Sequence, residues 1–378
     1  MVRGHDCHEG KFTEDACSYP TRVGRILNHL FVSESIDPYH LEVSNSESEI
    51  FIPISNLARS ATPTGGVIPS LSVMLESLES PPSAIFVDFS VNDLFAIRRT
   101  PIATEALIRF VRENYPSTEI FFVESFCADA GYNSYLTHKL VAEYYGVPFI
   151  SYRSAVSPNC GSDHVWGFNK SSKHDRQMHP PWYVHRNIAY SIVQGLFRFI
   201  QEECSKDMRL DQKIIPLPSP HSSLEELRSF EVCKPISYYD ANERLKSGDE
   251  SGVLVYNESW RLFEDRKDKA GWISTKGGSV IEFDVEFGSQ PRLVIGFLRS
   301  YAGMGRAKLT FPDLPGSRIE NLNGLDLTSH TSQTFPMFVY PWGLDSKGVV
   351  RKFEGKTKVS IETVYDDLKF KIIYVLSC

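Results

Sequence analysis

The sequence lacks any long hydrophobic run: its 378 residues contain no window of 18 or more apolar residues. A helix needs about 20 such residues to cross a bilayer, so we expect no membrane-spanning segment. The N-terminal stretch MVRGHDCHEG also lacks the apolar core of a signal peptide. As written, the chain carries no export signal, and its localisation stays open, with the secretory pathway available to it if the N-terminus is incomplete.

Runs of basic residues are missing as well. The chain has 40 Lys and Arg against 47 Asp and Glu, which gives a formal net charge of -7. Recognition of a phosphate backbone requires clustered Lys and Arg. We therefore expect no nucleic-acid partner.

Cysteine and metal-binding patterns are sparse. The seven cysteines include no Cys-x-x-Cys pair, and they are too few and too scattered for a disulfide scaffold. Cys7 and Cys17 lie ten residues apart in a polar segment, where they form either a local disulfide or two free thiols. The histidines include no His-Glu-x-x-His pair with a third ligand, so we expect neither a metal nor a cofactor. We interpret His185 as a packing residue or as one that supports the site residues without touching the substrate.

The first 200 residues alternate short apolar runs with helical patterns. The runs AIFVDF (84–89), EIFFVES (119–125) and VPFIS (147–151) are almost continuously apolar, which is typical of strands in a sheet buried on both faces. Apolar residues recur at helical spacing between them, as at Leu136 and Leu140. This alternation predicts an α/β domain, in which helices flank a parallel sheet.

A longer helix is predicted at the end of this domain. Its apolar residues recur every three or four positions and form one stripe: Val184, Ile188, Ile192, Leu196 and Phe199. We place the first domain at residues 1–203. The following residues, 204–250, contain the Pro- and Ser-rich run IIPLPSPHSS and are predicted to be a linker or a wrap-around segment.

Residues 251–378 change to a period of two. The run VIEFDVEF sets Ile281, Phe283, Val285 and Phe287 against acidic residues at the alternate positions, as in an antiparallel strand with one face in water. The runs RLVIGFL, KVSIETVY and LKFKIIYV add further strands. This second domain is predicted to be an antiparallel β-sandwich with the four apolar residues pointing inward.

Candidate catalytic residues come from three loops of the first domain. Sites in open parallel sheets lie beyond the carboxyl ends of the strands. His179 precedes the last helix and is suited to be a general base, while Asn92 directly follows a buried strand. Asn92 and the backbone N–H groups of Gly65 and Gly66 are the kind of donors that stabilise an oxyanion.

Taken together, these residues resemble the SGNH hydrolase superfamily, also called the GDSL esterases. The resemblance covers residues 1 to 200 and rests on a Gly loop, an Asn-Asp pair after a strand, and an Asp/His block before the last helix, in that order. It implies a flavodoxin-like sheet, with Asn92 and Gly65 or Gly66 as oxyanion donors. His179 would be the base that activates a serine, and Asp175 the carboxylate that orients it.

The sequence departs from the family pattern at three places. Ser90 stands where the family has a Gly, and Asp175 lies four residues before His179 where the family has its acid three before. The nucleophile block Gly-Asp-Ser-x-x-x-Gly is missing, although Gly4 resembles its last glycine. The expectation is that the nucleophilic serine lies upstream of Met1 and that the chain as given is inactive or a very poor esterase.

The predicted function is thus that of a serine ester hydrolase, for which an O-acetylated carbohydrate is the suggested substrate. A small molecule or glycan ester would be its partner, and the oligomeric state is not predicted. The alternative is a non-catalytic protein that binds a glycan or another protein through the remains of the pocket. Both remain open at the level of the sequence.

Overall fold

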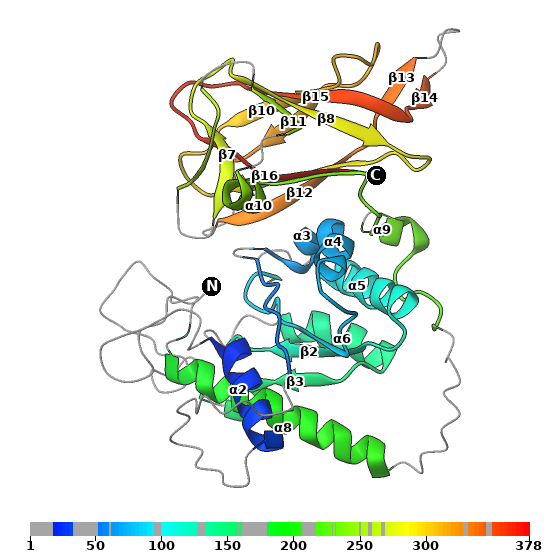
Figure 1. Cartoon of the computed structure of the whole chain (residues 1–378), viewed down its shortest axis with the longest axis vertical. Helices are drawn as coiled ribbons and strands as arrows, with labels where there is room; N and C mark the ends of the chain where they lie inside the picture. The colour runs from blue at the N-terminus through cyan, green and yellow to red at the C-terminus, as the bar shows by residue number, and fades with distance from the viewer. Residues whose placement is uncertain are drawn as a thin grey trace. The chain divides into compact units, whose positions relative to one another are not determined.

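The computed structural model of the chain describes residues 18–32, 52–59, 62–93, 100–127, 134–157, 159–160, 180, 182–205, 217–228, 230, 232–248, 251–255, 259–265, 269–327, 332–344 and 350–378. The chain divides into two compact units, each assembled from three pieces of the sequence (Figure 1). The first unit comprises Met1–Ala58, Pro81–Ile97 and Val111–His221, and the second comprises Arg59–Ser80, Arg98–Phe110 and Ser222–Cys378.

The first unit is built on a parallel sheet with the strand order β1-β2-β3. Its strands are β1 (Ala84–Val87), β2 (Glu119–Glu124) and β3 (Phe149–Ser151). Both neighbouring pairs run parallel, so the predicted sheet and the positions of these strands are confirmed.

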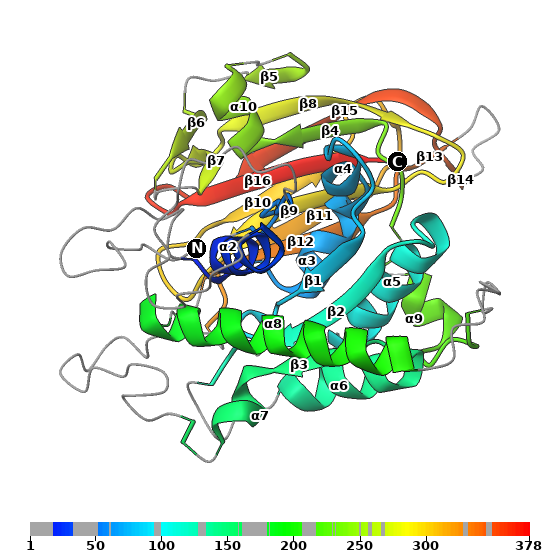
Figure 2. The same ribbon diagram turned by 60° about the horizontal axis from the view of Figure 1, so that its bottom comes forward.

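Helices cover both faces of this sheet. The helices of the first unit are α2 (Tyr19–Val32), α6 (Ser134–Tyr145), α7 (Tyr152–Val156) and α8 (Trp182–Ser205), and α5 (Thr100–Asn114) is divided between the units, because its residues up to Phe110 belong to the second. Phe121 and Val123 of β2 share one buried core with residues of α2 and α8, which lie side by side in Figures 1 and 2. Phe122 alternates to the other face, where its ring lies 5.8 Å from that of His138 on α6. Apolar partners on both sides explain why the strands are continuously apolar.

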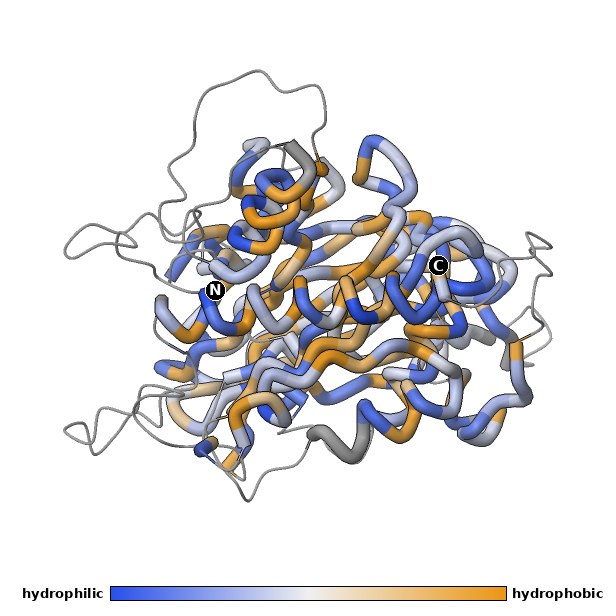
Figure 3. The backbone as a smooth tube through the Cα atoms, turned by 90° about the horizontal axis from the view of Figure 1, so that it is seen from below, coloured by the Kyte–Doolittle hydropathy of each residue, from blue (hydrophilic) through white to orange (hydrophobic). Residues whose placement is uncertain are grey.

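The long helix α8 has the predicted apolar stripe. Val184, Ile188 and Ile192 are buried, and Leu196 and Phe199 pack against the same core. Polar and apolar residues alternate along the helix (Figure 3). The expectation for α6 was wrong in one respect, because Leu140 is 60% exposed and is not part of the apolar face.

The second unit contains two packed antiparallel sheets, of order β11-β10-β15-β8-β5 and β12-β9-β16-β7-β6, with β4 paired to β16 and a separate hairpin β13-β14. The strands are β4 (Ser237–Asp240), β5 (Val253–Val255), β6 (Arg261–Glu264), β7 (Ala270–Ser274), β8 (Val280–Phe287), β9 (Leu293–Arg299), β10 (Arg306–Thr310), β11 (Glu320–Asn323), β12 (Gln333–Val339), β13 (Trp342–Leu344), β14 (Val350–Lys352), β15 (Gly355–Thr363) and β16 (Phe370–Ser377).

The predicted register of β8 is confirmed. Ile281, Phe283, Val285 and Phe287 all lie in the core between the two sheets. Glu282 keeps access to solvent and pairs with Lys358 at 3.7 Å across the outer face. A slip by one residue would have exchanged the two faces.

Short elements complete the second unit. They are α3 (Thr64–Val67), the 3₁₀ turn η1 (Ile68–Ser70), α4 (Leu71–Glu76), α9 (Leu224–Arg228) and α10 (Ala241–Ser247). The segment 204–250 therefore contains α9, β4 and α10 besides irregular chain, and β4 joins the sandwich by pairing with β16. The limits of the domains as expected from the sequence remain a prediction.

Candidate functional site

Ser90 ties the carboxyl ends of β1 and β2 together. Its hydroxyl is fully buried and donates a hydrogen bond of 2.7 Å to Oδ1 of Asp88. The Ser90 hydroxyl oxygen also accepts the backbone N–H groups of Ser125 and Phe126, each at 3.2 Å. A glycine at position 90 could make none of these side-chain bonds. Ser90 therefore links the segments after β1 and β2 through hydrogen bonds that a glycine would not provide.

Asp88 extends this network to helix α2. The Tyr19 hydroxyl donates to Oδ2 of Asp88 at 2.9 Å, and burial together with the Asp88 charge raises the pKa of Tyr19. The Tyr19 ring lies parallel to that of His185, with the centroids 5.8 Å apart. His185 is buried, as expected of a packing residue.

Asn92 lies in the turn between Ser90 and Asp93 and is half-buried. The backbone N–H of Asp93 donates to the carbonyl of Phe89 at 2.9 Å, which closes the turn. The Asp93 carboxylate meets Nε2 of His138 at 2.7 Å, and the two side chains are only 1% and 2% exposed. The turn that carries Asn92 is therefore bonded on both sides.

A second acid lies at the end of β2. The Ser151 hydroxyl donates to Oε2 of Glu124 at 2.6 Å, and it also accepts the backbone N–H of Ser154 at the start of α7. Burial raises the pKa of Glu124, and the hydrogen bond from Ser151 opposes this effect. The carboxyl edge of the sheet is thus lined with polar groups that are already hydrogen-bonded, as a preorganised site requires.

Gly65 and Gly66 lie within helix α3 and not in the loop ahead of a helix that the sequence suggested. The Gly66 N–H donates to the carbonyl of Pro63 at 2.8 Å, and the Gly66 carbonyl accepts the Tyr374 hydroxyl at 3.2 Å. Both glycines belong to the second unit, whereas Asn92 belongs to the first. Their convergence on one site remains a prediction.

His179 and Asp175 lie outside the described residues, as do Cys7 and Cys17. The roles of His179 as base and Asp175 as its orienting acid therefore remain predictions. In the described part of the chain, no group of three or more His, Cys, Asp or Glu side chains is arranged to hold a metal ion. Among the same residues, no helix combines the length and the apolar character needed to cross a bilayer.

Disulfides were missed at the level of the sequence. Cys127 and Cys160 are bonded with their Cα atoms 5.0 Å apart, and Cys233 and Cys378 with theirs 6.1 Å apart. The sequence analysis considered only a bond between Cys7 and Cys17, whereas these two bonds join cysteines 33 and 145 residues apart in the chain. Cys204 is a free and exposed thiol.

The structural residues Tyr19, Ser90 and His138 were also missed. A lone tyrosine, serine or histidine has no spacing pattern that would mark it, since the contacts of these residues to Asp88, Ser125 and Asp93 cross 35 to 69 residues. For Ser90, the one signal in the sequence was its position two residues before Asn92.

Comparisons with known proteins support the fold. No family model and no curated protein sequence matches the chain. Among solved structures, a two-domain esterase active on acetylated mannans matches with a TM-score of 0.54 at 18% identity, over 84% of this chain and 78% of the esterase. The structure of such an esterase co-crystallised with mannopentaose gives a TM-score of 0.52 at 16% identity, over 84% and 77% of the two chains. The fold of this chain is therefore similar to that of a two-domain esterase, in line with the α/β domain and sandwich that the sequence predicted.

Proposed function

We propose that this chain is a serine ester hydrolase of the SGNH type that acts on an acyl ester of a carbohydrate. The proposal rests on the turn after β1, where buried bonds at Ser90 and Asp93 hold Asn92 at the carboxyl edge of a parallel sheet. A fixed amide donor in that place is suited to stabilise an oxyanion. The substrate class is taken from the solved esterase of similar fold, which is active on acetylated mannans.

In the proposed reaction, His179 accepts the proton of the hydroxyl that attacks the ester carbonyl. The carbonyl oxygen becomes an oxyanion, to which Asn92 and a glycine N–H donate hydrogen bonds. Collapse of the tetrahedral intermediate expels the sugar hydroxyl, which takes its proton from His179. Where the attacking hydroxyl belongs to a serine, water then releases the acyl group from that serine by the same sequence; where it belongs to water, the free acid is formed directly. Asp175 orients the imidazole throughout.

Of the two glycines, we assign Gly65 as the donor. The Gly66 N–H already donates to Pro63, and Gly66 is buried. Gly65 is half-buried one residue earlier in the same turn.

The nucleophile sets the expected rate. Residues 1–378 contain no Gly-Asp-Ser block, so water takes the place of the serine in this chain. In a studied serine protease without its triad, the oxyanion donors and substrate binding still accelerate the reaction roughly 10³ to 10⁴-fold over the uncatalysed rate. This turnover is about a million-fold below that of the enzyme with its full triad. We therefore predict weak but measurable hydrolysis.

Hydrolysis of p-nitrophenyl acetate and of acetylated manno-oligosaccharides tests this proposal. We expect a rate above that of buffer, which Asn92→Ala lowers by about 100-fold or to the buffer rate, since one oxyanion donor is worth 10² to 10³. His179→Ala should also lower it. The matched control is Asn321→Ala, which removes an exposed amide from β11 and should leave the rate unchanged. Fast turnover that depends on His179 would contradict the absence of a nucleophile.

A second candidate function is a glycan-binding protein without catalysis, which the absence of a Gly-Asp-Ser block favours. Calorimetry with the same acetylated manno-oligosaccharides separates the two. Binding without hydrolysis above the buffer rate would support this second function. A chain that neither binds nor hydrolyses them would exclude both.

A further inference from the structure

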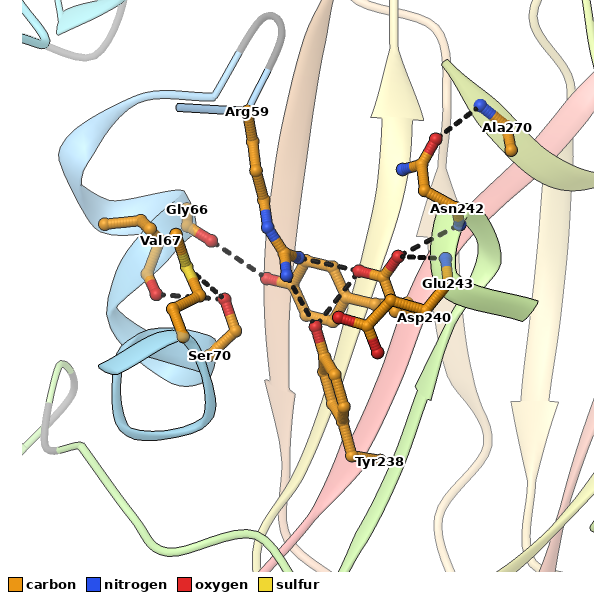
Figure 4. A network of polar contacts seen from close by, with 11 residues as sticks. Arg59, Gly66, Val67, Ser70, Tyr238, Asp240, Asn242, Glu243 and Ala270 are labelled. Carbon is orange, nitrogen blue, oxygen red and sulfur yellow. Dashed lines mark hydrogen bonds and ion pairs between the residues drawn. The ribbon is translucent and has the colours of Figure 1, made fainter. Parts of the chain in front are cut away.

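The segment that carries Gly65 belongs to the β-sandwich unit, although it stands between α2 and β1 in the sequence. Arg59 begins this segment. Its Nη1 lies 2.7 Å from Oδ2 of Asp240, and its Nη2 donates to the Tyr238 hydroxyl at 2.8 Å (Figure 4). Both partners belong to β4, so the segment is fixed to a strand of the sandwich.

Asp240 is itself held in place. It is buried, and its Oδ1 accepts the backbone N–H groups of Asn242 and Glu243 at the start of α10 (Figure 4). The Tyr238 hydroxyl donates to the other oxygen at 3.0 Å. Burial lowers the pKa of Arg59, but the Asp240 and Tyr238 contacts outweigh it and leave the pKa above its ordinary value, so the guanidinium stays charged.

Tyr374 of β16 makes the second attachment. The alternation of β16 is interrupted between Ile372 and Tyr374: Ile372 and Val375 lie in the core between the sheets, whereas Tyr374 lies on the opposite face of its sheet. A β-bulge re-aims side chains in this way. Gly296 on the paired strand makes room, because a Cβ there would collide with the Tyr374 ring. On this face of the sheet, the Tyr374 hydroxyl donates a hydrogen bond to the Gly66 carbonyl at 3.2 Å.

The glycine pair fits closely onto this face. A Cβ on Gly65 would lie 2.9 Å from the ring of Phe230, which is too close for it to fit without a shift, whereas a Cβ on Gly66 would lie at an ordinary contact distance of 3.4 Å from the carbonyl oxygen of Thr334 on β12. The Ser72 hydroxyl donates to the carbonyl of Cys233 at 3.2 Å, further along the segment. The backbone at Gly65 is thus set by the sandwich from several directions.

We propose that Tyr374 and Arg59 are positioning residues for Gly65, the backbone donor assigned above. This inference rests on the proposed function and extends it. Tyr374 touches neither the substrate nor the reacting atoms, but it fixes the carbonyl of the residue that follows the donor. Arg59 fixes the start of the same segment.

The test uses the full chain and a matched pair of variants. Tyr374→Phe removes only the hydroxyl that bonds Gly66. Tyr239→Phe removes an equivalent buried hydroxyl on β4, which donates to the carbonyl of Asp284 and makes no bond to the segment. We expect Tyr374→Phe to lower kcat for p-nitrophenyl acetate by about three- to tenfold with KM unchanged, because small displacements of positioned groups are costly. Tyr239→Phe should leave both constants unchanged.

Hydrogen exchange of residues 62–76 gives a second measurement, and it should become faster in Tyr374→Phe but not in Tyr239→Phe. Arg59→Lys, which keeps the charge but loses one of the two contacts, should lower kcat less than Arg59→Met. Equal kinetic constants in the two tyrosine variants, with turnover that still depends on Asn92, would overturn this inference alone. No turnover by the unaltered chain would overturn the proposed function and this inference together.

Discussion

At the scale of single residues, Lys371 is a deeply buried charge of the sandwich. Its side chain is 2% exposed, and its Nζ lies 2.5 Å from Oδ1 of Asp265, whose other oxygen accepts Lys369 at 2.9 Å. Burial alone would raise the pKa of Asp265, but hydrogen bonds from Lys371 and Lys369 outweigh it and lower the pKa below 3.8. Removing the acid would leave a buried ammonium without its counter-ion.

Asp265→Asn should therefore lower the free energy of unfolding by about 3 kcal/mol at neutral pH. Because the pKa of Asp265 is lowered by folding, its contribution is complete above the unfolded value of 3.8 and is lost as the pH falls below it. The difference between the unaltered protein and the variant should shrink on acidification from pH 5 to pH 2 in urea melts. The control is Glu286→Gln, whose ion pair with Lys356 is exposed and is worth at most about 1 kcal/mol. A constant difference at all pH values would contradict the assignment.

Glu124 should have the opposite pH dependence. Burial raises its pKa above 4.5 in the folded chain, so its stabilising contribution is present below pH 4.5 and is lost as the pH rises through the folded value. Glu124→Gln keeps an acceptor for Ser151 and should melt at a higher temperature than the unaltered protein at pH 7, but at a similar temperature at pH 4. Glu362→Gln, at an exposed position of β15, should show no such pH dependence. A lower melting temperature of Glu124→Gln at pH 7 would refute this explanation.

Residue roles were predictable only where the sequence carries a local pattern. The burial of Ile281 and Phe283 follows from a period of two, but Asp265 and Lys371 are 106 residues apart and no spacing rule links them. Tyr374 would lie between the sheets by alternation, and only the irregularity in β16 turns it outward. The sequence also could not show that Gly65 and Gly66 pack against Phe230 and β12.

At the scale of elements, the strongly periodic segments were predicted and the short ones were not. The strand at 280–287 and the helix at 182–205 agree with the sequence pattern, because each buries one face against a core. The strand β4 was missed because its four residues, Ser237–Asp240, are too few to show a period. Its position is decided by pairing with β16, which follows more than 130 residues later.

The two disulfides link elements that lie far apart in the sequence. Disulfides are typical of proteins that mature in an oxidising compartment. In the chain-entropy estimate, a bond that closes 145 residues stabilises by up to about 5 kcal/mol and one that closes 33 residues by up to about 4 kcal/mol. Each pair should therefore matter for stability.

Replacing Cys233 and Cys378 together by Ser should lower the free energy of unfolding by up to about 5 kcal/mol, and Cys127 with Cys160 by slightly less. Cys204→Ser, at an exposed free thiol, should change stability little. Mass spectrometry after alkylation of the unfolded, unreduced protein should find label on Cys204 and none on the four paired cysteines. Labelled Cys233 or Cys127 would show that the bond is absent.

At the scale of the whole molecule, the sequence predicted an α/β part followed by an antiparallel sandwich, and both are present. The sequence pattern did not predict which segments belong to which unit. Residues 59–80 and 98–110 belong to the sandwich unit although they stand inside the α/β part of the sequence. Periodicity identifies elements one at a time, and it contains no information on which of two cores an element joins.

The bond between Gly66 and Tyr374 spans 308 residues, and this has a consequence for how the protein is made. A ribosome that adds 5 to 20 residues per second needs about 15 to 60 seconds to travel that distance. Arg59 and the glycine turn have been translated when this interval begins, β4 is added within it, and β16 is added only at its end. The Gly66 carbonyl therefore lacks the Tyr374 hydroxyl until the last strand emerges, so this attachment forms only late in synthesis, well after the segment itself has left the ribosome.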